Sequence, residues 1–167
     1  MIFPVEAPFT WGSRFGEPRP NGRTHQGVDL VAREGAELYA CEDGVIGAVY
    51  IDPLGGNAVT LKGASGARYY YAHLSRFAVR GGDRVQAGEV VGYVGTTIGH
   101  RSGATIPHLH FELHPNGGAA VDPEPALRTA TTRAPRAVAV PALGLAAAVV
   151  VGFALLLLRG KRGAPRR

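Results

Sequence analysis

The sequence is poor in residues that mark several common protein classes. Among its 167 residues there are one cysteine, one methionine and one tryptophan. A single cysteine cannot form a disulfide within the chain, so a disulfide-stapled scaffold is excluded. Cys41 lies in an apolar stretch and is most simply a small buried residue, with a nucleophile paired to a histidine as the alternative. No convincing amphipathic helix is found in residues 1–127, where we expect almost no helix.

Acidic residues are absent from residues 128–167, which hold eight of the 18 lysines and arginines. Residues 1–127 therefore carry ten basic and 13 acidic side chains, and the net charge of +5 belongs to the C-terminal region. A basic excess placed on both sides of an apolar run is typical of a membrane flank. We therefore do not expect nucleic-acid binding.

The long apolar run covers residues 137–158 and has no charged or strongly polar side chain. At about 1.5 Å per residue it is long enough to cross a hydrocarbon core of about 30 Å. We predict four parts: a soluble domain at 1–127, a flexible linker at 128–136, one transmembrane helix at 137–158 and a basic tail at 159–167.

Five basic residues follow the apolar run at 159–167, whereas three lie in the segment 128–136 just before it. This bias favours a single-pass protein of the cell membrane with a cytoplasmic C-terminus and a domain on the outer, wall-facing side. Residues 1–5 are too short an apolar segment for a secretory signal, so we expect the chain to begin directly with its domain. Two alternatives stay open, a tail-anchored domain that faces the cytoplasm and a start upstream of Met1.

Short apolar segments alternate with turns rich in glycine between residues 38 and 95. The predicted strands are 38–41, 44–51, 58–62, 67–74, 84–86 and 90–94. Many short strands and 24 glycines in the chain indicate an all-β protein, a sandwich or barrel of mostly antiparallel strands. Residues 95–107 are expected to form a loop, in which His100 is interpreted as a solvated residue.

A strand with strict polar and apolar alternation is expected at residues 107–114, PHLHFELH. Extended geometry places His108, His110, Glu112 and His114 on one face and the apolar side chains on the other. Two neighbouring histidines on a strand are suited to bind a metal and to face whatever that metal holds. The alternative is an exposed face that happens to carry histidine.

A second polar motif, HQGVDL at residues 25–30, places His25, Gly27 and Asp29 on one face if it is extended. The two polar residues would then lie about 13 Å apart, too far to share one ion. A bend would bring them together, and Gly27 is the easiest place for it. Further along, His73 falls in phase with Tyr71 on a predicted strand, where a structural role is the simpler interpretation.

Four segments, in this order, resemble the lysostaphin-type (LytM-domain) zinc metallopeptidases that cut peptidoglycan peptides. They are His25-x-x-x-Asp29, YAHLS at 71–75, GDRVQAGEVVG at 82–92 and PHLHFE at 107–112. The resemblance runs from about residue 3 to residue 127. It implies a largely antiparallel β fold, a barrel-sandwich of the duplicated hybrid motif, with a groove over the sheet.

By position, the resemblance implies that His25, Asp29 and His110 are ligands of Zn²⁺. It implies that His73 and His108 are the two histidines beside the water that the metal activates. Two imidazoles and one carboxylate leave a fourth tetrahedral position open, as in catalytic zinc sites. Imidazoles suit proton transfer near neutral pH, and which of the two is the general base stays open.

The resemblance implies a zinc metalloendopeptidase that hydrolyses peptide bonds in peptidoglycan stems or cross-bridges, and the apolar run at 137–158 predicts that it is membrane-anchored. One alternative is a non-catalytic wall-binding or hydrolase-activating module of the same fold. Such modules typically lack ligands, whereas all five matched positions are filled here. A second alternative is a phosphocarrier, against which Asp29 argues, because a carboxylate beside His25 favours a cation over a phosphoryl group.

Overall fold

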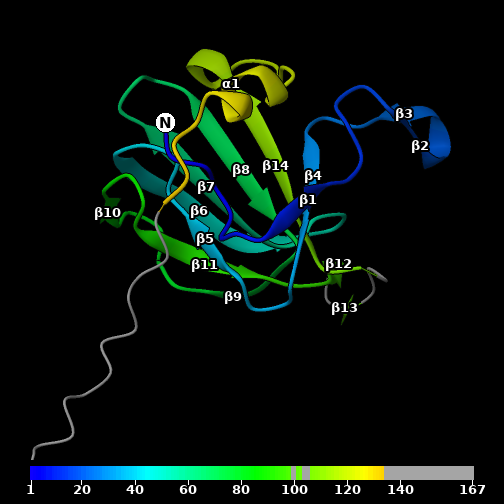
Figure 1. Ribbon diagram of the computed structural model, residues 1–167, viewed down its shortest axis with the longest axis horizontal. Coiled ribbons are helices and arrows are strands. Elements are labelled where there is room, and N and C mark those ends of the chain that lie inside the picture. Colours follow the sequence, from blue (N-terminus) through cyan, green and yellow to red (C-terminus); the bar gives the residue numbers. More distant parts are fainter. Residues whose placement is uncertain (99–100, 103–105, 134–167) are drawn as a thin grey trace, which may run out of the picture. The chain divides into compact units, whose positions relative to one another are not determined.

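The computed structural model describes residues 1–98, 101–102 and 106–133 (Figure 1). The predicted transmembrane helix at 137–158, the basic tail at 159–167 and His100 lie outside these residues. Within the described part, no helix has both the length and the apolar character needed to span a membrane.

A seven-stranded antiparallel sheet is the centre of the domain (Figure 1). In spatial order its strands are β1 (Phe9–Trp11), β4 (Val28–Ala32), β14 (His108–His114), β8 (Arg68–Ala72), β7 (Gly56–Gly63), β6 (Gly44–Asp52) and β10 (Arg84–Val85). A second sheet has the order β5 (Glu37–Tyr39), β11 (Val90–Val94) and β9 (Leu74–Phe77). The prediction of a mostly antiparallel β fold is confirmed.

Smaller elements decorate the two sheets. A hairpin of β2 (Pro18–Arg19) and β3 (Arg23–Thr24) turns through the 3-10 helix η1 (Pro20–Gly22) and projects from the main sheet in Figure 1. The expected loop at 95–107 contains a second hairpin, β12 (Thr97–Ile98) with β13 (Arg101–Ser102). Two short helices, η2 (Pro115–Gly117) and α1 (Glu124–Arg128), follow β14. Elements of two to five residues are too short to show a period, so the sequence did not reveal them.

Side-chain alternation gives the main sheet one apolar face and one polar face. On β14, Leu109 and Phe111 are fully buried in the core, where Phe111 packs against Tyr71 with ring centroids 5.2 Å apart. On the other face, Ala58 and Ala72 form a small separate cluster with Tyr70. Because these two side chains are small, they leave space above the sheet, and the polar residues of β14 border that space.

After α1 the chain returns to its own beginning. Thr131 forms a parallel bridge with Ile2, and the amide of Phe3 donates to the carbonyl of Thr131 at 2.9 Å. The guanidinium carbon of Arg133 lies 4.9 Å from the ring centroid of Tyr39. Residues 128–133, the described part of the predicted linker, are thus attached to the domain.

Candidate metal centre

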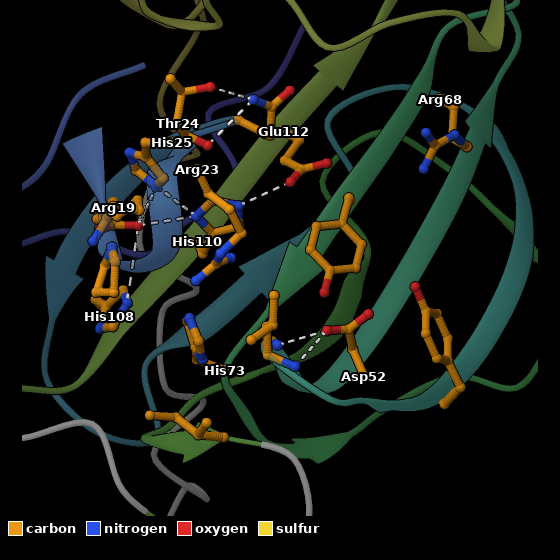
Figure 2. A pocket seen from close by; sticks show the side chains of 18 residues that line it. Arg19, Arg23, Thr24, His25, Asp52, Arg68, His73, His108, His110 and Glu112 are labelled. Carbon is orange, nitrogen blue, oxygen red and sulfur yellow. Dashed lines mark hydrogen bonds and ion pairs between the residues drawn. The ribbon is translucent and has the colours of Figure 1, made fainter. Parts of the chain in front are cut away.

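Three side chains from two neighbouring segments bring their donor atoms together on the polar face of the sheet (Figure 2). β14 pairs with β4 in a register that sets His110 opposite Asp29. His25 Nε2 lies 3.0 Å from Asp29 Oδ1 and 2.8 Å from His110 Nδ1, and the last two atoms are 3.0 Å apart. This trio, called the donor cluster below, is a group that could hold a metal ion.

A bend before β4 brings His25 to Asp29. His25 and Gln26 lie outside the strand, and the chain bends at Gly27, where the sequence suggested it. A Cβ atom on Gly27 would lie 2.2 Å from the carbonyl oxygen of Phe111. Glycine is therefore needed here because the backbone passes so close to β14. The bend at Gly27, which the sequence analysis gave as the condition for a shared site, is thus present, and β4 begins one residue later.

Hydrogen bonds on the outer side of each imidazole determine where its protons lie. His25 Nδ1 is 2.8 Å from the carbonyl oxygen of Arg14, and His110 Nε2 is 3.1 Å from a carboxylate oxygen of Glu112. Both oxygens can only accept, so these two nitrogens carry the hydrogens of the neutral rings. His25 Nε2 and His110 Nδ1 then point lone pairs at each other and at Asp29.

Three lone-pair-bearing atoms about 3 Å apart repel one another unless a cation or a proton lies between them. The cluster is also shielded from water, since His25 is 4% and Asp29 8% exposed. Zinc bonds of about 2.0–2.1 Å at tetrahedral angles require ligand atoms about 3.3 Å apart, within a few tenths of an ångström of the distances found. Two imidazole nitrogens and one carboxylate oxygen therefore fit a zinc ion.

The pKa values of the cluster residues also indicate a site for a cation. Burial by itself would raise the pKa of Asp29, but the imidazoles of His110 and His25, which donate to its carboxylate when protonated, and the guanidinium of Arg19 outweigh it and hold that pKa far below its usual range. For His110, burial lowers the pKa, and the carboxylates of Asp29 and Glu112 more than compensate, so that the pKa is raised. The cluster thus favours positive charge in its centre, which a proton or a metal ion supplies.

A second layer of side chains holds the donor cluster in place. Arg19 donates to Asp29 Oδ2 at 2.7 Å, which leaves Oδ1 for the cluster. Glu112 bridges two imidazoles, because its other oxygen lies 2.7 Å from His114 Nε2. Such outer partners fix the orientation of metal ligands.

The helix α1 also supports the donor cluster, indirectly, through Arg14. Both carboxylate oxygens of Glu124 accept from Arg14 NH1 at 3.0 Å, and the carbonyl of Arg14 holds His25. The sequence analysis assigned no role to Arg19, Glu112, His114 or Glu124. Only the polar alternation of residues 108–114 was a signal for two of them.

His73 and His108 face each other beside the donor cluster, with ring centroids 4.5 Å apart. The carbonyl oxygens of Thr97 and Ile106 accept from their Nδ1 atoms at 2.7 and 2.9 Å. Both Nε2 atoms therefore carry lone pairs. His108 Nε2 lies 3.9 Å from Asp29 Oδ1. Burial lowers the pKa of His73 to about 4, so this ring is neutral at neutral pH.

His73 reaches this position through an unusual backbone conformation. Simple alternation along residues 67–74 would turn it to the core side together with Tyr71. Instead β8 ends at Ala72, His73 has φ +65°, and β9 begins at Leu74. The left-handed corner turns the imidazole to the polar face, and the His73 amide donates to the carbonyl of Gly55 at 2.7 Å. Such a conformation is uncommon in non-glycine residues, although histidine adopts it more often than most.

All five residues predicted for the site thus lie at one groove on the polar face of the sheet. The groove has a volume of about 590 Å³. Its lining includes the five and also these residues: Arg19, Pro20, Arg23, Thr24, Gln26, Tyr50, Asp52, Leu54, Gly55, Arg68, Tyr70, Ile98 and Glu112. Figure 2 shows His73, His108 and His110 directed into the same space. The individual roles of the five residues remain predictions.

A β protein with a metal-ion donor cluster at the floor of an open groove, and two further imidazoles beside it, has the arrangement expected of a metal-dependent hydrolase. Comparison with known sequences identifies the family. The pattern of Peptidase family M23 matches residues 23–123, and the chain belongs to that family.

Named relatives agree with this assignment. The chain is 40% identical over 115 residues to the glycyl-glycine endopeptidase ALE-1 of Staphylococcus capitis, covering 66% of this chain and 31% of that protein. It is 39% identical over 113 residues to the DD-carboxypeptidase/endopeptidase Mpg of Neisseria meningitidis serogroup B, covering 68% of this chain and 25% of that protein. The chain thus spans about a quarter to a third of the length of these relatives.

Solved structures show the same fold. The catalytic domain of the antimicrobial peptidase lysostaphin from Staphylococcus simulans superposes with a TM-score of 0.64 at 35% identity, covering 72% of this chain and 93% of that one. A zinc containing peptidase from Vibrio cholerae superposes with a TM-score of 0.64 at 30% identity, covering 77% of this chain and 39% of that one. The M23 resemblance deduced from the sequence is therefore confirmed.

Proposed function

We propose that this protein is a zinc metalloendopeptidase that hydrolyses peptide bonds in peptidoglycan. The observation that carries the proposal is the donor cluster, in which three lone-pair-bearing atoms from His25, Asp29 and His110 meet in a buried position within 3.0 Å of one another. A bound zinc ion would supply a Lewis acid for the scissile carbonyl and would lower the pKa of the attacking water. The M23 family and its peptidoglycan-cutting relatives support the substrate class.

The chain's own residues would handle the protons. His73 and His108 each keep Nδ1 as a donor to a backbone carbonyl, so each offers Nε2 to the groove as an acceptor. One of these imidazoles would accept the proton of the attacking water, and the other would stabilise the developing negative charge or protonate the leaving amine. The fixed Nδ1 bonds hold both rings in the orientation that proton transfer requires.

The test separates metal binding from proton transfer. We expect one zinc per chain by elemental analysis, and clearing of purified peptidoglycan that stops with a chelator and returns with added zinc. Asp29→Ala and His110→Ala should lose both zinc and clearing. His73→Ala and His108→Ala should lose clearing and keep zinc.

Two results would change the proposal. Zinc without clearing of several wall types would indicate a wall-binding module instead of an enzyme. A zinc-free His110→Ala protein that still clears peptidoglycan would refute the ligand assignment.

We also propose that residues 137–158 anchor the protein in the cell membrane, with the M23 domain on the wall-facing side. The uncharged apolar run and the larger number of basic residues after it support this placement. The whole chain should remain in membranes after alkaline carbonate extraction, whereas a chain ended at Arg136 should be released. Recovery of the whole chain in the soluble fraction would contradict the proposal.

A further inference from the structure

The groove beside the donor cluster has charged side chains of both signs, and its carboxylates are all engaged within the protein. Asp29 accepts from Arg19, and Glu112 lies between two histidines. Asp52 accepts from the backbone amides of Leu54 and Gly55 at 2.8 and 2.7 Å. Asp29 and Glu112 thus have charged or imidazole partners, whereas the partners of Asp52 are neutral backbone amides.

The three arginines of the groove lining differ in whether they have a hydrogen-bond or ion-pair partner within the protein. Arg19 is paired with Asp29, and Arg68 NH2 lies 2.9 Å from His114 Nδ1. Among the residues that the structure describes, Arg23 has no hydrogen-bond or ion-pair partner. Figure 2 shows Arg23 on the same side of the groove as His110. Within the described residues, Arg23 is thus the arginine of the groove lining whose guanidinium has all its donors available for a ligand.

The hairpin register makes this position of Arg23 unfavourable by itself. In the β2–β3 pair, Arg19 and Arg23 are direct cross-strand partners. Directly opposite residues project to the same side of a hairpin, and like charges placed so are destabilising. The turn between them is tight, because Asn21 and Gly22 have φ values of +63° and +70°. An anion that contacts both guanidinium groups would relieve their repulsion.

We propose that Arg23, together with the groove-facing part of Arg19, binds a carboxylate of the substrate next to the scissile bond. Arginine presents its donors in a planar fork that matches a carboxylate with two parallel hydrogen bonds. The side chain of Arg19 is 31% exposed, so it still has donors to offer beyond the one that Asp29 occupies. The inference rests on the endopeptidase function proposed above and specifies its substrate class.

The consequence is a preference for anionic stem peptides over uncharged segments such as oligoglycine. The relatives named above include both a glycyl-glycine endopeptidase and a DD-carboxypeptidase/endopeptidase. An uncharged backbone offers Arg23 only carbonyl oxygens, and hydrogen bonds to these are weaker than those to a carboxylate. The charge of the hairpin therefore favours stem peptides with a free carboxylate.

The experiment compares two forms of one substrate on the whole zinc-loaded chain. Synthetic stem peptides are prepared with a free carboxylate next to the cleaved bond and with that group as its amide, and kcat/KM is measured for both. For the protein as it stands we expect the carboxylate form to be cleaved about 10- to 100-fold better, since a charge-assisted hydrogen bond contributes about that factor. Arg23→Gln should remove this difference by slowing only the carboxylate form.

Matched controls make the result specific. Arg84→Gln removes the same charge from β10, an exposed edge strand of the main sheet, and should leave the preference unchanged. Arg23→Lys keeps the charge without the fork and should retain part of the preference. A higher salt concentration should reduce the preference of the unchanged protein, because it screens exposed charges.

The possible failures can be told apart. Equal cleavage of both peptides, or equal loss on both in Arg23→Gln, would overturn the carboxylate inference while the endopeptidase function stands. If neither the peptides nor purified peptidoglycan are cleaved by the zinc-loaded protein, the proposed function itself fails and the inference falls with it. Loss on both peptides in Arg84→Gln as well would show that overall charge, and not Arg23, determines the rate.

Discussion

Replacing Glu112 tests whether the second layer controls metal binding. Glu112 makes two contacts, at 3.1 Å to His110 and 2.7 Å to His114, and its side chain is 16% exposed. Glu112→Ala would leave the outer nitrogen of a metal ligand without its acceptor. Loss of such an outer partner lowers metal affinity by about 10- to 100-fold. We expect the lower half of this range, because Glu112 lines the groove and water can replace part of the lost bond.

Glu112→Gln should have a smaller effect. A glutamine oxygen can still accept from one imidazole, but the bond loses its charge, and charge-assisted bonds are roughly twice as strong as neutral ones. The difference of about 1 kcal/mol corresponds to about a fivefold loss of zinc affinity.

The assay is a competition between metal-free protein and a colorimetric zinc chelator. Glu34→Gln is the matched control, since it makes the same charge change at an exposed side chain in the turn after β4 that is not part of the groove lining. We expect the unchanged protein and Glu34→Gln to bind zinc equally well. Glu112→Gln should bind it more weakly, and Glu112→Ala more weakly still. Wild-type affinity in Glu112→Ala would refute the reasoning that this carboxylate orients His110.

Three further predictions concern stability and the buried thiol. Burial lowers the pKa of His73 to about 4, whereas the unfolded chain protonates it near 6.5, so metal-free protein should lose about 3 kcal/mol of stability as the pH falls from 6.5 to 4. His73→Gln should flatten this slope in urea denaturation, and an unchanged slope would contradict the shift. Burial raises the pKa of Cys41 to about 12, so an aromatic disulfide reagent should react only after unfolding; rapid reaction with inactivation would revive the nucleophile interpretation. Leu61→Ala, at a fully buried core position, should lower the free energy of unfolding by about 2–5 kcal/mol and leave zinc affinity unchanged.

Much of the fold could be predicted because many of its strands are short apolar segments bounded by glycine-rich turns, a pattern that is visible locally in the sequence. The expected strand at 90–94 coincides with β11, and those at 44–51 and 84–86 differ from β6 and β10 by one residue at an end. Alternation along residues 108–114 correctly separated Leu109 and Phe111 from the histidines. Alternation cannot predict a backbone corner that turns the next side chain to the other face of the sheet. His73 lies at such a corner.

The three residues of the donor cluster could be predicted from the spacing of the sequence motifs, whereas the side chains that hold them in place could not. His25, Asp29 and His110 stand in segments whose order carries the family resemblance. Glu124 pairs with Arg14 across 110 residues of sequence, and Arg19 pairs with Asp29 across the β2–β3 hairpin and the bend at Gly27. Such pairs depend on how loops cross above the sheet, which no local pattern encodes.

The bridge between Ile2 and Thr131 has a consequence for how this domain can be cut and rejoined. Because the two ends of the folded unit meet there, a short peptide joining Arg133 to Met1 would close the chain into a ring with little strain. New ends could then be opened at the exposed turn of Gly81 and Gly82, away from every residue of the groove lining. The domain is thus suited to circular permutation, and to insertion into a surface loop of another protein, with its groove unbroken.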